Sequence, residues 1–179
     1  EGGLVVCNAP HLEDKLKLIR SHGLRREKRH YWHEYYGNNF RLSNILAAIG
    51  YGQLEKHQEI IANKQRVYDV YREELKKISN ISLQHFSNKS EPVIWAVAIC
   101  LNNEMVERDF IMDQLKEKGI ECRPGFYTPD QLPTYSEGNV RFPIANSVAS
   151  RTIVLPSYPA LNNDTIKKIC SDLIDFLCK

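Results

Sequence analysis

A long helical pattern near the middle of the chain most strongly constrains its fold. The pattern starts at Ser43, a candidate N-cap, and continues to about Ser79. Its first part, 45–50, is apolar nearly all round, so we expect it to be buried on several sides. Its second part, 57–78, is amphipathic and presents one apolar stripe. A helix pair of this length can join two domains.

The segments on either side of this pattern predict different structures. Before it, 4–7 reads as a buried strand, and a helix is expected from about His11 to His22, ended by Gly23. The second half predicts a small sheet covered by helices. Its expected elements are strands at 81–86, 93–101, 120–122 and 153–156, and helices at 108–118 and from Asn162 or Asn163 onward.

We therefore expect an α/β chain with a domain boundary near Ser79. Residues 1–79 are expected to be the end of a large domain together with the bridging helices. Residues 80–179 are expected to form a small α+β C-terminal domain. The length of 179 residues suits a domain plus part of another.

Charge and cysteine content exclude several classes of protein. The formal net charge of +2 is too small to indicate binding to nucleic acid or to an anionic membrane surface. No apolar run approaches the roughly 20 residues that cross a bilayer. The five cysteines are scattered and form no C-x-x-C pair, so neither a zinc site nor a redox motif is expected. Reduced thiols in a cytoplasmic protein are the simplest account.

The segment 31–44 carries the strongest functional signal. It places Trp, His, Arg and four Tyr or Phe residues just before a predicted helix. Anions collect at helix N-termini because the N–H groups there are unpaired and the dipole is positive. Arg41 and the side-chain amide of Asn39 add donors for phosphate or carboxylate. The alternative is a structural loop whose rings pack under the helix, and composition alone leaves both open.

A second segment, 121–135, follows a predicted strand and contains three prolines. Arg123 at the strand end and Tyr127 beyond it form a plausible contact site for an anion and a ring. The alternative is a proline-stiffened surface loop with Arg123 in an ordinary ion pair. His30 and His33 have no acidic or Cys partner at suitable spacing, so we expect no metal site.

A series of ordered motifs resembles the sugar aminotransferases of the DegT/DnrJ/EryC1/StrS family. Residues 1–6 resemble its G-E-G-G stretch, and 31–44 resemble its W-H-x-x-x-G-Y-N-Y-R-M-x-N motif. Residues 47–54 resemble A-A-I-G-x-x-Q-L, and 123–135 resemble R-P-F-F-Y-P-x-H-x-Q-P-x-Y. Leu155-Pro156 before the last helix resembles the final motif. The resemblance covers essentially the whole chain.

This resemblance implies fold type I and dependence on pyridoxal 5′-phosphate, as PLP or its amino form PMP. It implies a homodimer with shared active sites that moves an amino group from glutamate to a keto-sugar of a nucleoside-diphosphate sugar. Residues 1–79 would then be the end of the large PLP-binding domain. The Schiff-base Lys is expected upstream of Glu1, so we expect no catalytic residue in this chain and no activity of the chain alone.

The resemblance also assigns roles to single residues. Asn39 matches the motif Asn that reaches the cofactor phosphate of the neighbouring subunit, and Arg41 matches the Arg beside it. Substrate contacts are assigned to four residues: Trp32, His33, Arg123 and Tyr127.

The sequence departs from the family motifs at Asn38, Gly125, Thr128 and Asp130. Gly125 replaces a Phe and would remove ring surface, and Asp130 stands where many members have His. Members acting on 4-keto-6-deoxy sugars, such as perosamine synthases, often lack that His, which favours this substrate type. Two alternatives stay open: a PMP-dependent 3-dehydratase of the same fold, in which His replaces the Lys, and a non-catalytic dimerisation or binding module.

Overall fold

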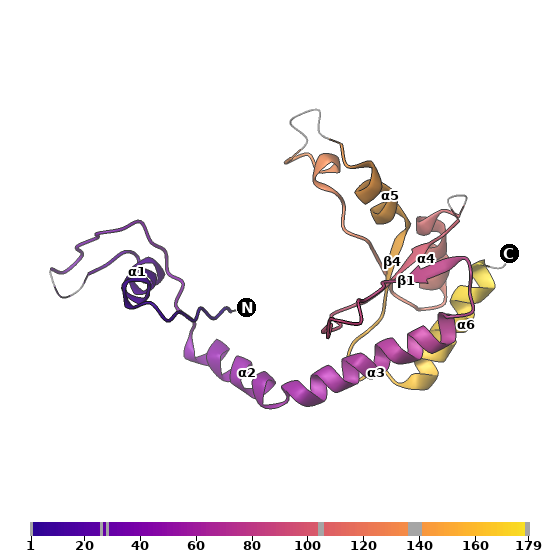
Figure 1. Ribbon diagram of the computed structural model, residues 1–179, viewed down its shortest axis with the longest axis horizontal. Helices are drawn as coiled ribbons and strands as arrows, with labels where there is room; N and C mark the ends of the chain where they lie inside the picture. Colours follow the sequence, from indigo (N-terminus) through magenta and orange to yellow (C-terminus); the bar gives the residue numbers. More distant parts are fainter. Residues whose placement is uncertain (1, 26, 28, 104–105, 136–140, 178–179) are drawn as a thin grey trace. The chain divides into compact units, whose positions relative to one another are not determined.

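The computed structural model describes residues 2–25, 27, 29–103, 106–135 and 141–177 (Figure 1). Its contacts divide the chain into two compact units, with the division between residues 57 and 58. Within the described part of the chain, no helix has the length and apolar character needed to cross a membrane.

The described part of the first unit contains the helices α1 and α2, and both agree with the sequence prediction. Helix α1 spans Pro10–Arg20, with Pro10 at its first position, where the missing N–H costs nothing. Helix α2 spans Asn44–Glu55. The side chain of Ser43 caps it, because the Ser43 hydroxyl accepts a hydrogen bond of 3.3 Å from the Leu46 N–H. The predicted N-cap is therefore confirmed.

Two predictions for the first unit are wrong. The segment 4–7 is not a strand, and Leu4 is 89% exposed. A buried strand needs neighbouring strands on which to pair, and the described part of this unit contains only isolated bridges. The apolar start of α2 is not buried either: Ile45 is 75% exposed. Apolar periodicity indicates a surface that can be covered, but it does not show what covers it.

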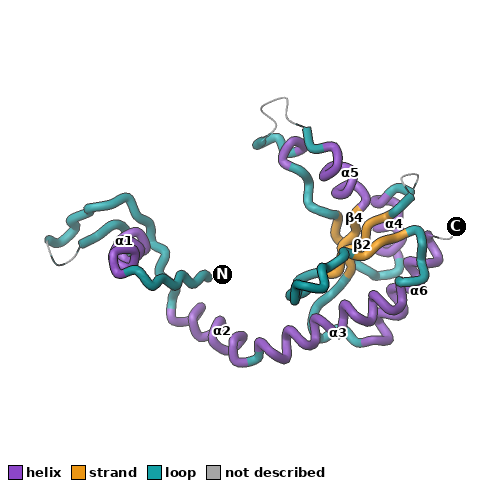
Figure 2. Tube along the Cα trace, in the orientation of Figure 1, coloured by secondary structure: helices purple, strands orange, loops and turns teal. Residues whose placement is uncertain are grey.

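The second unit is built on a four-stranded antiparallel sheet with strand order β1-β2-β4-β3 (Figure 2). The strands are β1 (Ile81–Leu83), β2 (Val97–Leu101), β3 (Arg123–Pro124) and β4 (Thr152–Leu155). Burial alternates along the two central strands. Val97 lies opposite Leu155 and Ile99 opposite Ile153, and all four side chains are buried.

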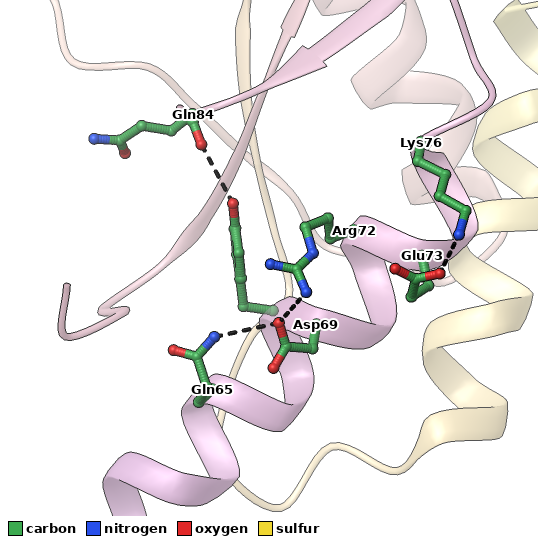
Figure 3. Close-up of polar contacts among 7 residues, drawn as sticks. Gln65, Asp69, Arg72, Glu73, Lys76 and Gln84 are labelled. Atoms are coloured by element: carbon green, nitrogen blue, oxygen red, sulfur yellow. Dashed lines mark hydrogen bonds and ion pairs between the residues drawn. The ribbon is translucent and has the colours of Figure 1, made fainter. Parts of the chain in front are cut away.

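Helices α3 (His57–Leu75), α4 (Arg108–Glu117) and α6 (Asn163–Leu177) contribute buried side chains to the same core as this sheet. Helix α6 starts as expected, because the Asn162 side chain accepts from the Thr165 N–H at 2.8 Å. Each of these helices buries apolar side chains along one stripe. Figure 3 shows polar contacts on α3, where Gln65 and Arg72 both contact Asp69.

Helix α3 explains why the contacts divide at 57–58 rather than at Ser79. Its stripe of Val67, Tyr71 and Leu75 is almost fully buried in the core of the second unit. The helix therefore packs with the residues that follow it. The assignment of the two parts to a large and a small domain stays a prediction.

The strands of the second unit are shorter than predicted. The expected strands at 81–86, 93–101 and 153–156 appear as β1, β2 and β4, whereas the strand expected at 120–122 lies at 123–124. Two elements were not predicted: the 3₁₀ turn η1 (Pro129–Gln131) and helix α5 (Pro143–Arg151). Helix α5 has no buried residue: its apolar Ile144 and Val148 lie one turn apart, and both are exposed.

We expect Ile153→Ala to destabilise the protein by about 2–5 kcal/mol, because it leaves a cavity in the middle of the core. Ile144→Ala is the matched control, since Ile144 lies on α5 and is 81% exposed. We expect it to change stability by less than about 0.5 kcal/mol. Denaturant unfolding measures both, and equal losses would show that the core lies elsewhere.

Candidate functional site

Two segments of the first unit pass each other with almost no space between their backbones. A Cβ atom on Gly23 would lie 1.7 Å from the Tyr35 carbonyl oxygen, and one on Gly37 would lie 2.5 Å from the Gly23 nitrogen. Gly23 also has a φ of +67°, a conformation that other residues adopt at a cost. Only glycine fits at either position, so these two residues determine how the segment 33–40 lies against the end of α1.

Main-chain hydrogen bonds hold the functional segment in this place. The Asn38 N–H donates to the Ile19 carbonyl at 3.1 Å, and the Phe40 N–H donates to the Arg20 carbonyl at 3.0 Å. Asn39 lies between these two bonds and forms an isolated bridge with Ser21. Its backbone is therefore fixed, while its side chain remains exposed.

Asn39 and Arg41 both present hydrogen-bond donors. The Asn39 side-chain oxygen accepts from the Arg41 N–H at 3.4 Å. This contact directs the Asn39 oxygen toward the chain, and the amide N–H₂ group has no acceptor among the described residues. The Arg41 side chain is also exposed. An amide and a guanidinium suit a phosphate, which carries acceptors only, so these two residues fit the phosphate of the expected cofactor.

His33 and Trp32 lie in the same unit. The His33 Nδ1 is 2.8 Å from the His22 carbonyl, which fixes the ring and leaves Nε2 free of this contact. Two main-chain hydrogen bonds hold Trp32: its carbonyl accepts from the Arg25 N–H, and its N–H donates to the Arg29 carbonyl. Trp32 is about half exposed. The structure thus brings Trp32, His33, Asn39 and Arg41 into one unit.

The basic run after Gly23 is tied into this unit. The Arg25 Nε donates to the Glu34 carboxylate at 2.6 Å. This bond and the charge of Glu34 raise the pKa of Arg25. Arg25 therefore forms an ion pair with Glu34. Arg26 and Lys28 of the same basic run lie outside the described residues.

Arg123 lines a groove of about 790 Å³ in the second unit. Four basic side chains line it, namely Lys64, Lys118, Arg123 and Lys168, against the single acidic side chain of Glu121. This excess of basic groups is larger than the formal net charge of +2 of the whole chain. The aromatic residues Trp95, Phe126 and Tyr158 also line the groove. Such a lining can bind an anion joined to a planar ring.

Helix α3 holds one wall of this groove, the segment 156–161. Arg66 donates to the carbonyls of Pro159 and Leu161 at 3.0 and 2.9 Å. The Tyr71 hydroxyl donates to the Pro156 carbonyl at 2.9 Å. These bonds satisfy the main-chain carbonyls of an irregular segment, which would otherwise be costly to bury.

The sequence predicted this groove only in part. Arg123 lines it, but Tyr127 does not; Tyr127 is 60% exposed, and its neighbour Phe126 takes the lining position. Sequence reasoning points to no chemical role for residues 153–161, Lys64 or Trp95. Because these residues lie far apart in the chain, only the folded arrangement reveals them.

Asp130 connects η1 to the start of α5. Its carboxylate accepts from the Asn146 side-chain amide at 3.0 Å and from the Phe142 N–H at 3.4 Å. Hydrogen bonds with Asn146 and Thr128 hold the pKa of Asp130 below its ordinary value. Asp130 therefore fixes the loop that follows Arg123.

We expect Asp130→Asn to lower the unfolding midpoint at neutral pH. A lowered folded-state pKa stabilises above the ordinary carboxyl pKa of 3.8, and this contribution is lost as pH falls through the folded-state pKa. The difference from wild type should therefore shrink on acidification. Thermal unfolding across pH measures this, with Asp113→Asn, an exposed carboxyl on α4, as control. A pH-independent difference would contradict it.

The sequence matches a family model across nearly its whole length. The DegT/DnrJ/EryC1/StrS aminotransferase family model matches residues 1–174. GDP-perosamine synthase of Escherichia coli O157:H7 is 37% identical over 177 residues, which are 98% of this chain and 47% of that protein. GDP-perosamine synthase of Vibrio cholerae is 38% identical over 174 residues, 96% of this chain and 47% of that protein. The chain thus spans about half the length of these relatives.

Solved structures share the fold. Helicobacter pylori PseC, an aminotransferase involved in the biosynthesis of pseudoaminic acid, has a TM-score of 0.85 at 22% identity, over 95% of this chain and 47% of that one. The S. venezuelae DesV structure has a TM-score of 0.83 at 20% identity, over 96% and 45%.

Proposed function

Because the chain belongs to the DegT/DnrJ/EryC1/StrS aminotransferase family, we propose that it is part of an enzyme that transfers an amino group from glutamate to a keto-sugar of a nucleoside-diphosphate sugar. The observation that carries this proposal is the 37–38% identity to two GDP-perosamine synthases over nearly the whole chain. It favours an amino sugar made on a nucleotide carrier. The Schiff-base lysine would be supplied from outside residues 1–179.

The first unit would hold the cofactor phosphate. When bound, pyridoxal 5′-phosphate supplies the carbonyl group that receives and passes on the amino group. The exposed Asn39 amide would donate to its phosphate without adding charge, and Arg41 would neutralise part of its charge. In a homodimer with shared active sites, these residues would serve the neighbouring subunit's cofactor.

The second unit would hold the nucleotide-sugar. The Arg123 guanidinium can donate two parallel hydrogen bonds to a diphosphate, and the rings of the groove can stack on a base or cover a sugar. Tyr127, an exposed residue of this unit, would add a substrate contact. Trp32 and His33, exposed in the first unit, are proposed separately as substrate contacts. The four cysteines in the described residues are free thiols, which supports a reducing, cytoplasmic compartment.

A glutamate half-reaction tests the proposed function. The full-length protein loaded with the cofactor should release 2-oxoglutarate from glutamate and should shift the cofactor absorbance in the same stoichiometry. The dehydratase alternative predicts loss of water from the sugar without a net amino group in the product, which mass spectrometry distinguishes. Absence of both reactions would overturn the proposal of an enzyme.

We expect Asn39→Ala in the full-length protein to weaken cofactor affinity about 10-fold or more, because a hydrogen bond to a charged group is lost. Asn38→Ala is the matched control: it removes the same amide one residue earlier and should leave affinity unchanged. Absorbance titration with pyridoxal 5′-phosphate measures both. Equal affinities would remove Asn39 from the cofactor site.

We expect Arg123→Met to raise KM for the nucleotide-sugar about 10-fold or more and to leave cofactor affinity unchanged, because a diphosphate loses its guanidinium partner. Arg72→Met, which removes an exposed guanidinium paired with Asp69 on α3, is the control. Steady-state kinetics at saturating glutamate separates the two. An unchanged KM would leave Arg123 in a structural role.

A further inference from the structure

Lys64 has an unusual set of partners. Its ammonium donates to the Ser157 carbonyl at 2.6 Å and also to the Trp95 carbonyl. These acceptors belong to two segments that lie 31 and 93 positions further along the chain. Arg72 on α3 and Lys76 just beyond its end instead contact carboxylates of the same helix, Asp69 and Glu73.

Both acceptors belong to walls of the groove that contains Arg123. Trp95 lines the groove and is 70% exposed, and Ser157, which also lines it, precedes the aromatic lining residue Tyr158. The Ser157 hydroxyl accepts from the Val97 N–H at 3.3 Å, so the same two segments meet again at the start of β2. Lys64 therefore joins the two segments that carry these rings.

The Lys64 ammonium lies in a partly buried position. Burial lowers the pKa of Lys64, which is the cost of removing the charge from water. The two carbonyl dipoles compensate this cost in part. They do not neutralise an ammonium charge, whereas a carboxylate would. An ammonium has three N–H donors, and within the described part of the chain only two have acceptors.

We propose that Lys64 is a positioning residue for the Arg123 groove: by tying the Trp95 and Ser157 segments to α3, it fixes the ring walls and adds one donor for an anionic ligand. This inference rests on the proposed function, which places the nucleoside diphosphate in this groove. Lys64 holds the two wall segments and leaves its third N–H for the ligand, whereas Arg123 contacts the diphosphate with its guanidinium.

Lys64→Met removes the donors and the charge while keeping most of the aliphatic stem. In the full-length enzyme we expect KM for the nucleotide-sugar to rise about 10-fold, because two carbonyls lose their donor and the walls shift. The affinity for GDP, measured by calorimetry, should fall by a similar factor. Cofactor absorbance and KM for glutamate should not change, whereas a merely structural role would lower the amount of active enzyme without raising KM.

Conservative and control variants sharpen this test. Lys64→Arg keeps charge and several donors, and should restore KM to within about threefold of wild type. Lys76→Met removes an exposed lysine that pairs with Glu73 just beyond α3, and should leave KM unchanged. If Lys64→Met does not fold, Lys64→Gln replaces it, and we expect GDP affinity to fall at least threefold.

A readout independent of activity separates this inference from the proposed function. The protein labelled with 5-fluorotryptophan gives a fluorine resonance for Trp95, assigned by Trp95→Phe. We expect Lys64→Met to shift this resonance, and Lys76→Met to leave it in place. An unshifted resonance together with unchanged GDP affinity would overturn the role of Lys64. An inactive wild-type enzyme whose Trp95 resonance still responds would overturn only the proposed reaction.

Discussion

The first unit depends on the close passage of two backbones at Gly23 and Gly37. A side chain at either position would overlap main-chain atoms, at 1.7 Å and 2.5 Å respectively. Because the segments lie this close, the Asn38 and Phe40 N–H groups reach carbonyls at the end of α1. The exposed donors of Asn39 and Arg41 thus stand on a rigid support, which a binding site for phosphate needs.

In the second unit, α3 combines two functions on different faces. Its apolar stripe, including Val67 and Tyr71, completes the core against the sheet. Its basic side chains, Lys64 and Arg66, donate to carbonyls of the irregular segment after β4. A single helix therefore stabilises the core and determines the shape of the groove. The position of Arg123 follows from the sheet, because Arg123 pairs with Val154 on β4.

The sequence predicted the elements with strong periodicity or clear caps, such as α1, the Ser43 cap and α6. It failed where structure depends on distant partners. The strand expected at 4–7 has no strand partner among the described residues of its unit, and α5 has no buried residue. The groove was predicted only through Arg123, because Lys64 and Trp95 meet through main-chain carbonyls, which leave no pattern of side chains in the sequence.

Two departures from the family motif have physical causes in this chain. Gly125 stands where the family motif has a Phe, and a Cβ there would lie 2.8 Å from the Thr152 Cβ and 3.0 Å from the Ala149 carbonyl oxygen. The N–H of this buried glycine also donates to the Thr152 carbonyl at 2.9 Å. The Asp130 carboxylate accepts a hydrogen bond from the Asn146 side chain at the start of α5. Both residues therefore shape the loop after Arg123 from within, so any selectivity that they confer acts through the loop's position.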